Sequence, residues 1–268
     1  MRLTVSLLFS ALMLPATVMA RDLVLTSPPR ESASKAREVF QPIAKYLSRV
    51  LVQPVVFKYS DNWLSYQSEM QKDLYDIVFD GPHFVSWRSA KLHHVPMVKL
   101  PSQLSFVIVA RKDSQNLNSL NDLNGRPLCT PAPPNLGALI VLHEFTNPVR
   151  QPQLKNTAGF PQAYEGMIAK KCLAAVLQIK IFEKLDKDKQ LAKILFQSKG
   201  MPNQAFTASP RINDALRKRI IEALLSEQGK QVTKKLRDEY NGQDFVPATA
   251  EEYQDIHLLL KDIWGFEI

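Results

Sequence analysis

The chain has 268 residues, enough for one large domain or two of ordinary size, and its 45% hydrophobic and 22% charged residues exclude a disordered chain. The formal charge of +8 is spread along the sequence. Nucleic-acid binding would require a basic cluster with interleaved aromatic residues, and the sequence contains none. The excess of positive charge is better explained by solubility, an acidic partner or an anionic ligand.

The first 20 residues have the pattern of a secretory signal peptide. Arg2 supplies a short positive region, an uncharged apolar run extends from Leu3 to Val18, and Ala20 ends a small-residue cleavage pattern. An uncleaved N-terminal anchor is the alternative, although the run is short for a transmembrane helix. No Cys follows the cleavage point for lipid attachment, and no later stretch is apolar enough to span a bilayer. We therefore expect a mature chain secreted to a bacterial periplasm.

Strands and helices alternate along the first part of the mature chain. The patterns predict strands at 22–27, 55–59, 76–79 and 94–99, with helices at 33–52, 63–72 and 82–91 between them. Such alternation with short connections is typical of a parallel sheet covered by helices.

A second α/β unit follows a midpoint near Pro101. It has predicted strands at 104–110, 128–130, 172–176 and 193–197, helices at 136–145 and 162–169, an irregular segment at 147–160 and an exposed charged segment at 183–189. A short strand at 204–208 and helices at 211–225, 229–240 and 250–260 come last, and we expect them to pack on the first unit. The predicted organisation is a signal peptide at 1–20, lobe 1 at 21–102 plus 204–268, and lobe 2 at 103–203. In this organisation the chain passes between the lobes twice, near residues 101–105 and 198–206, and these two crossings form a hinge. The cleft between the two lobes is the expected ligand site.

The two cysteines, Cys129 and Cys172, favour a disulfide in an oxidising compartment. Two separately buried thiols are the alternative. A metal site is disfavoured, because neither Cys has a second Cys or a His at ligand spacing.

The segment from Tyr75 to Phe84 reads as a buried strand, a Gly-Pro turn and a helix start. Ligands of open α/β sheets bind beyond the carboxyl ends of strands, where a helix N-terminus adds free N–H groups. Asp80, with Gly81 beside it, either contacts the ligand or simply caps the helix. His83, in the first turn, either contacts the ligand or is exposed.

Other candidate ligand residues follow the first two strands and open later helices. Ser27, Arg30 and Ser32 follow the first strand, and Arg30 either clamps an oxyanion or forms a surface ion pair with Glu31. Trp63 is either part of the core or an aromatic wall of the cleft. Asn135 is a candidate helix cap and cleft residue, and Tyr164 faces either the cleft or the strand of Cys172.

Four short motifs follow one another along the chain in an order and at a spacing that can be compared with known families. They are Ser27-Pro28-Pro29-Arg30, Asp76 to Pro82, Leu120-Asn121-Asp122-Leu123-Asn124-Gly125-Arg126, and Pro202-Asn203-Gln204. Over nearly the whole mature chain the sequence resembles the PhnD-like phosphate/phosphonate periplasmic solute-binding proteins of ABC importers. The resemblance implies a two-lobed α/β fold of the type II periplasmic-binding-protein class, with two crossing hinge strands, and no catalysis.

The resemblance also implies site residues, with departures. Where the family has a Ser/Thr-rich helix start, this chain has Pro133-Pro134-Asn135-Leu136-Gly137, so only backbone N–H groups of Asn135, Leu136 and Gly137 remain to grip an anion. Trp63 corresponds to a family Tyr, Asp80 to an aromatic residue, and Gln204 to an acidic residue.

The sequence thus predicts a monomeric periplasmic protein that captures a small polar, oxyanion-containing ligand for an ABC permease. The alternative is a sensing subunit that docks on a membrane receptor. An enzyme is the rival from another class, but no GxSxG, HExxH or GxxxxGK[ST] motif is present. We expect no cofactor, no metal and no nucleic-acid partner.

Overall fold

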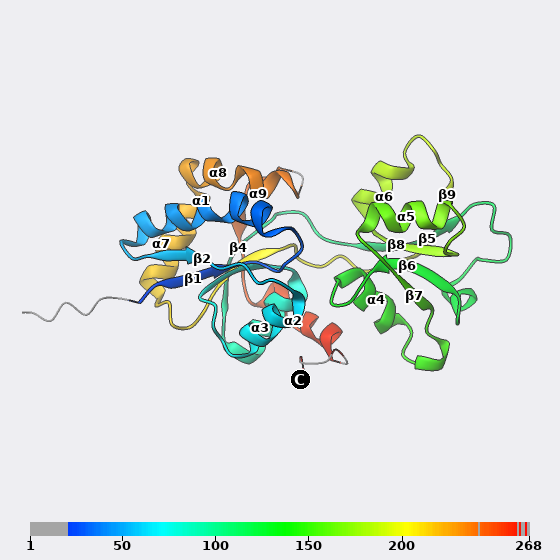
Figure 1. Cartoon of the computed structure of the whole chain (residues 1–268), viewed down its shortest axis with the longest axis horizontal. Helices are drawn as coiled ribbons and strands as arrows, with labels where there is room; N and C mark the ends of the chain where they lie inside the picture. The colour runs from blue at the N-terminus through cyan, green and yellow to red at the C-terminus, as the bar shows by residue number, and fades with distance from the viewer. Residues whose placement is uncertain (1–20, 241, 262, 264–265, 267–268) are drawn as a thin grey trace, which may run out of the picture.

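The computed structural model describes residues 21–240, 242–261, 263 and 266. The predicted signal peptide lies outside the described residues. Two lobes, each built on its own sheet, lie beside one another and are joined by extended connections (Figure 1).

Lobe 1 contains a six-stranded sheet in the order β11-β4-β10-β3-β1-β2. Strand β1 pairs in parallel with β2 and β3, whereas β10 lies antiparallel between β3 and β4. The strand bounds are β1 Leu23–Thr26, β2 Val55–Phe57, β3 Ile77–Asp80, β4 Val95–Lys99, β10 Ala205–Ala208 and β11 Val246–Pro247.

The prediction of a parallel sheet is therefore only partly right, because both sheets are mixed. In lobe 1 the exceptions are the edge strand β11, which is antiparallel to β4, and β10, which enters the sheet as the chain returns from lobe 2. The correction to the prediction is largest at β10, which lies inside the sheet. Its direction depends on that long-range return, which no local pattern encodes.

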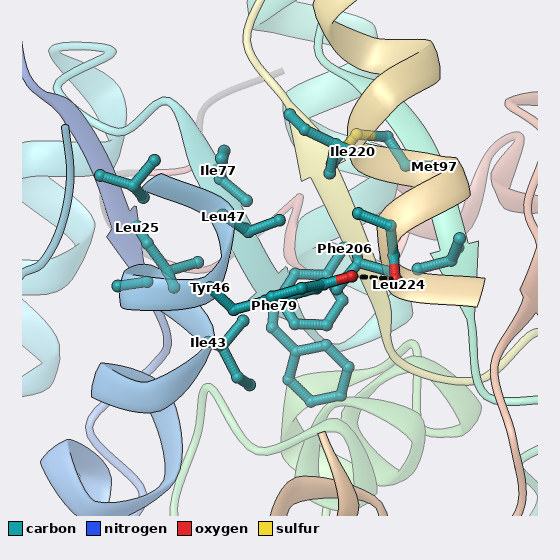
Figure 2. Close-up of a cluster of buried hydrophobic side chains, with 14 of the residues drawn as sticks. Leu25, Ile43, Tyr46, Leu47, Ile77, Phe79, Met97, Phe206, Ile220 and Leu224 are labelled. Carbon is teal, nitrogen blue, oxygen red and sulfur yellow. Dashed lines mark hydrogen bonds between the residues drawn. The ribbon is translucent and has the colours of Figure 1, made fainter. Parts of the chain in front are cut away.

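The helices of lobe 1 cover this sheet. They are α1 Ala33–Leu51, α2 Trp63–Gln71, α3 Pro82–Leu92, α7 Asp214–Leu225, α8 Glu227–Val232 and α9 Lys234–Asp238. Ile43 and Leu47 of α1 and Ile220 and Leu224 of α7 pack with Phe79 of the sheet in one buried cluster (Figure 2). Helices α7, α8 and α9 thus pack on the sheet of lobe 1.

Lobe 2 contains a five-stranded mixed sheet in the order β7-β6-β8-β5-β9. Its elements are β5 Phe106–Arg111, η1 Leu120–Leu123, β6 Pro127–Pro131, α4 Leu136–Glu144, η2 Pro148–Arg150, β7 Gln153–Thr157, α5 Phe160–Ile168, β8 Ala174–Gln178, α6 Ile179–Asp186 and β9 Ala192–Gln197. Two sequence interpretations were wrong here. The segment 147–160 contains edge strand β7, and α6 begins before the charged run because Phe182 and Asp186 are buried.

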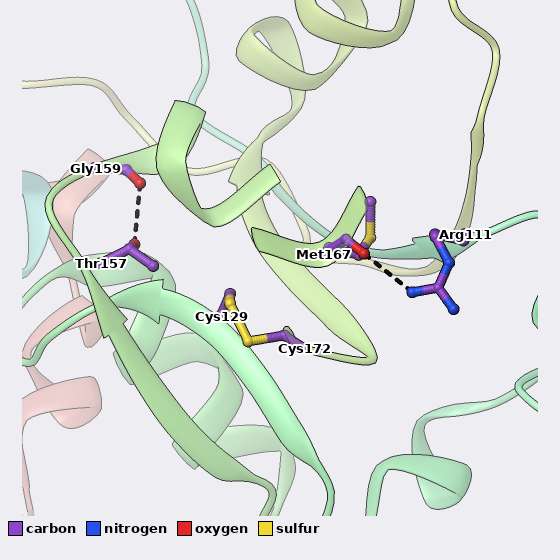
Figure 3. The surroundings of a disulfide bond; sticks show 6 residues. All are labelled: Arg111, Cys129, Thr157, Gly159, Met167 and Cys172. Carbon is purple, nitrogen blue, oxygen red and sulfur yellow. Dashed lines mark hydrogen bonds between the residues drawn. A yellow bond between two sulfur atoms is a disulfide. The ribbon is translucent and has the colours of Figure 1, made fainter. Parts of the chain in front are cut away.

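A disulfide joins Cys129 of β6 to Cys172, just before β8 (Figure 3). Both residues are buried, and their Cα atoms are 5.7 Å apart. The predicted disulfide is confirmed.

Two connections link the lobes, one between β4 and β5 and the other between β9 and β10. They pair at one point, where the Leu104 N–H donates to the Met201 carbonyl at 2.8 Å and the Met201 N–H donates to the Leu104 carbonyl at 2.9 Å. Nearby, the Asn203 side chain donates to the Ser102 hydroxyl at 3.0 Å. These bonds tie the two crossings into a hinge.

The segment 251–260 contacts both lobes. The predicted helix at 250–260 is instead two short 3-10 turns, η3 Glu251–Tyr253 and η4 Ile256–Leu260. Turn η4 packs against α3 of lobe 1 and α4 of lobe 2. Leu260 is fully buried in one cluster with Phe84 of α3 and Leu139 of α4.

Candidate ligand-binding site

A cavity of about 120 Å³ lies between the lobes. Lobe 1 and the chain entering β10 supply Arg30, Trp63, Gly81, Pro82, His83, Phe84, Gln204 and Tyr240. Lobe 2 supplies Leu104, Phe106, Pro134, Asn135, Leu136, Phe160 and Gln178. The lining is thus apolar and aromatic with a few polar groups, which is usual for small-molecule sites.

Two helices begin at this cavity from opposite lobes. Helix α3 starts at Pro82, directly after β3, and helix α4 starts at Leu136. Asn135 caps α4, since its side-chain oxygen accepts from the Gly137 N–H at 2.9 Å. The first N–H groups of a helix lack intrahelical partners, and the helix dipole makes this end positive. Both helix starts therefore favour an anion between them.

His83 connects the two lobes at the edge of the cavity. Its Nε2 lies 3.2 Å from the carbonyl oxygen of Pro134. A carbonyl oxygen only accepts, so Nε2 carries the proton and Nδ1 is the acceptor nitrogen. Burial, together with the charge of Arg30, lowers the pKa of His83 to about 3, and the imidazole is neutral at physiological pH.

Arg30 brings a positive charge to the same place. Its Nη1 donates to the Tyr240 hydroxyl at 3.2 Å, and its Nη2 lies 3.5 Å from the Asp80 carboxylate. A Cβ placed on Gly81 would lie 3.2 Å from this Nη2 and 2.9 Å from Cε1 of His83. Glycine at position 81 therefore lets Arg30 and His83 approach each other.

Asp80 does not line the cavity but lies behind it, fully buried. Its carboxylate accepts from Arg88 Nη1 at 2.9 Å, from the Tyr66 hydroxyl, and from the Gly81 N–H at 2.6 Å. Arg88 is itself fully buried. In this arrangement the carboxylate holds Arg88, the Gly81 turn and Arg30 in place.

Gln204 lies where the chain returns to lobe 1 and enters β10. Its side chain is 5% exposed, and its Oε1 has no hydrogen-bond partner among the described residues. Also in the lining, Trp63 stacks on Phe84 with ring centroids 6.0 Å apart. The aromatic pair gives the cavity an apolar side.

The structure brings most of the sequence-predicted residues together. Those that line the cavity are Arg30, Trp63, Gly81, His83, Asn135, Leu136 and Gln204. The others lie elsewhere: Ser27 borders a smaller neighbouring pocket, Ser32 caps α1, Asp80 lies behind the cavity, and Gly137 is buried in α4. Tyr164 lies on the side of the Cys172 strand, and its hydroxyl donates to Asp186 at 2.6 Å.

Sequence reasoning missed several lining residues. Gln178 ends β8, so the rule about carboxyl ends of strands would have found it had the strand end been placed correctly. Phe160 opens α5. Tyr240 follows the last helix of lobe 1 and carries no local signal, because only the return of the chain brings it to Arg30.

Within the described ranges, no group of three or more His, Cys, Asp or Glu side chains is arranged to hold a metal ion. The same part of the chain contains no helix with the length and apolarity needed to cross a membrane.

The two mixed sheets, the paired crossings and the cavity between the lobes define a type II periplasmic binding protein. Residues 25–253 match the family model described as the periplasmic phosphonate substrate-binding protein of ABC transporters. The chain belongs to this family, whose members bind solutes and do not catalyse reactions.

Solved structures show the same fold at low sequence identity. PhnD1 from Prochlorococcus marinus, determined in complex with methylphosphonate, has a TM-score of 0.68 and 15% identity, over 90% of this chain and 98% of that one. A binding protein of an ABC phosphonate transporter from Pseudomonas aeruginosa has a TM-score of 0.64 and 14% identity, over 89% and 85%. A Xanthomonas citri protein bound to ATP has a TM-score of 0.72 and 11% identity, over 93% and 100%. No curated protein sequence matches the chain.

Proposed function

We propose that the cavity between the lobes captures a small ligand with an oxyanion head, of the phosphonate or phosphate-ester class. One observation supports this most strongly: two helix N-termini from opposite lobes and the Arg30 guanidinium converge on the same cavity. Among the described residues that line it, none is a carboxylate. Such a site attracts an anion and disfavours a cation.

The departures from the usual family pattern are compatible with this ligand class. The start of α4 has no hydroxyl side chain, and the Asn135 and Gly137 N–H groups donate to Ala132 and to Asn135 Oδ1, but the positive end of the helix dipole still favours an anion there. The Asp80 carboxylate does not face the ligand, since Arg88 and Tyr66 bind it. The positive charge of Arg30 replaces part of the missing donor set.

The ligand also has room for a substituent. A second cavity of about 390 Å³ shares Leu104, Gln178 and Tyr240 with the first and is bordered by Lys184 and Glu239. A head group in the first cavity and a polar substituent in the second would fill both. Because the Xanthomonas relative was determined with ATP, nucleotides belong among the candidate ligands beside simple alkylphosphonates.

A thermal-shift screen of the mature protein tests the proposal. We expect phosphonates, phosphate esters or nucleotides to raise the melting temperature, since a ligand at about 100 times its Kd adds roughly 2.7 kcal/mol of stability. Amino acids and polyols are screened in parallel as ligands without a phosphonate or phosphate group. A hit among these alone, with none among the oxyanions, would overturn the proposal.

Two variants localise the effect. Arg30→Met removes the cavity's guanidinium and should abolish most of the shift. Arg126→Met changes an exposed arginine outside the cavity lining and should leave the shift unchanged. An equal effect of both variants would point to unspecific attraction between charges.

We further propose that the chain is exported through its N-terminal segment and delivers its ligand to an ABC permease. Family membership supports both statements. The mature protein should be recovered from the periplasmic fraction with Arg21 as its first residue. Cells that lack the protein should lose uptake of the labelled ligand; retained uptake with a lost transcriptional response would favour the sensing role instead.

A further inference from the structure

His83, which lines the cavity, has a buried ring nitrogen that is available as a hydrogen-bond acceptor. The side chain is 2% exposed, and its Nε2–H is used by the Pro134 carbonyl at 3.2 Å. Its Nδ1 has no hydrogen-bond partner in the described part of the chain. Buried polar atoms without partners are rare in folded proteins and need an explanation.

The neighbouring donors are already engaged. The Gly81 N–H donates to Asp80 at 2.6 Å, and Pro82 has no N–H to offer. Arg30 directs Nη1 to Tyr240 and Nη2 to Asp80. The Phe84 ring, 4.1 Å from the imidazole by centroids, covers one side without a donor.

Burial is the main cause that lowers the pKa of His83 and keeps the imidazole neutral, and the neighbouring charges act in the same direction. Arg30 from the loop before α1 and Arg88 from α3 both oppose its protonation. The other titratable groups nearby are Asp80 of β3, Tyr66 of α2 and Tyr240 after α9. Asp80 is bound by Arg88, Tyr66 and Arg30, and among the described residues of lobe 2 the hydrogen-bond partner of His83 is the Pro134 carbonyl. An unprotonated Nδ1 can only accept a hydrogen bond.

We propose that a ligand hydroxyl donates to Nδ1 of His83, so that the site selects an oxyanion that retains one proton over an equally shaped anion that is fully ionised. The inference rests on the proposed function, because it assumes an oxyanion in this cavity. The charged oxygens of the ligand face the helix starts and Arg30, and its P–OH group faces His83. The orphan Oε1 of Gln204 is a second acceptor for such a ligand.

A matched pair of probes tests the selection. Methylphosphonate carries a proton that dissociates near neutral pH, whereas methanesulfonate has a similar shape and no such proton. By isothermal titration calorimetry at pH 6.5, we expect methanesulfonate to bind roughly tenfold or more weakly, the effect of one lost hydrogen bond. Above the second pKa of methylphosphonate, its affinity should fall by about tenfold per pH unit.

Two substitutions test the roles of the two ring nitrogens of His83 separately. In His83→Gln the amide lies three bonds from Cβ, like Nε2, so the bond to Pro134 is kept and the acceptor at the Nδ1 position is lost. In His83→Asn the amide oxygen lies two bonds from Cβ, like Nδ1, and the bond to Pro134 is lost. We expect H83Q to lose the preference for methylphosphonate and H83N to keep it.

The outcomes distinguish the two proposals. Equal binding of both probes to the wild-type protein, or loss of the preference in H83N as well as H83Q, would overturn the role of Nδ1 and leave oxyanion binding intact. If neither these probes nor any phosphate ester binds at any pH, the proposed function itself fails. Circular dichroism and the melting temperature establish that each variant is folded.

Discussion

Asp80 shows how a residue near a ligand site can act without touching the ligand. Its carboxylate is fully buried and holds the equally buried Arg88 at 2.9 Å. Burying two charges is costly in itself, but removing one partner leaves the other charge uncompensated. Because Gly81 and Arg30 also bind Asp80, the same carboxylate shapes one wall of the cavity.

We therefore expect Asp80→Asn to affect folding at least as strongly as ligand binding. The loss should be about 3–5 kcal/mol, the usual effect of breaking a buried ion pair. Urea unfolding of the ligand-free protein measures it. The double variant Asp80→Leu/Arg88→Met, which removes both charges, should be less destabilised than Asp80→Asn; a greater loss in the double variant would contradict this account.

His94 makes the ligand-free protein sensitive to mild acid. Its Nε2 lies 3.1 Å from Asp73 Oδ1 and its Nδ1 3.4 Å from Thr207 Oγ1. Burial is the main cause that lowers its pKa from 6.5 to about 4. Between these values the unfolded chain binds more protons than the folded one, so stability falls as the pH is lowered.

Urea unfolding at several pH values between 7.5 and 4.5 should show this decrease. His94→Gln has no titrating ring, so its unfolding free energy should depend less steeply on pH over the same range. His83 contributes in the same direction and remains present in both proteins. An unchanged slope in His94→Gln would exclude His94 as a cause.

At the scale of elements, the disulfide stabilises the sheet of lobe 2. It joins β6 to the segment that opens β8, across a sequence separation of 43 residues. Closing a loop of this length restricts the unfolded chain. The bridge therefore stabilises the lobe that carries the start of α4.

Replacing both cysteines by alanine should reduce the free energy of unfolding by about 4 kcal/mol, the chain-entropy value for a loop of this size. Urea unfolding with and without a reducing agent measures the effect. The reducing agent should destabilise the wild-type protein and leave the Cys129→Ala/Cys172→Ala variant unchanged. If the reducing agent left the unfolding free energy of the wild-type protein unchanged as well, the disulfide would contribute nothing to stability.

On the scale of the whole molecule, turn η4 near the C-terminus couples the lobes. Turn η4 contacts both α3 and α4, and Leu260 shares a buried cluster with Leu139 of lobe 2. The His83–Pro134 hydrogen bond joins α3 to the turn just before α4. The lobes therefore contact each other away from the hinge as well as at it.

Leu260→Ala should cost about 2–5 kcal/mol, as expected for a large-to-small change in a core. Leu139→Ala, in the same cluster but on the other lobe, should not add independently to it. A double-mutant cycle by urea unfolding should give a coupling of at least about 0.5 kcal/mol. Strict additivity would mean that the end of the chain stabilises lobe 1 alone.

Much of this architecture could be predicted from the sequence. The strand just before the Gly81-Pro82 turn, the helix that follows this turn and the Cys129–Cys172 bridge are encoded locally or by cysteine number. The direction of β10 and the approach of Tyr240 to Arg30 are not, because they depend on the path of the chain through the other lobe. The burial of Asp80 depends likewise on Arg88 and Tyr66 folding back onto it, so composition alone left its role open.

The placement of β10 in the middle of the first sheet has a consequence for the order of folding as the chain emerges from its N-terminus. All strands of the lobe 2 sheet come from one continuous stretch that ends at Gln197, so this sheet can assemble as soon as that residue has emerged. The lobe 1 sheet begins earlier in the chain but lacks its central strand until Ala208 has followed. Strands β1, β2 and β3 can pair with one another before that, but the edges of β3 and β4 that pair with β10 stay open until the chain has emerged as far as Ala208.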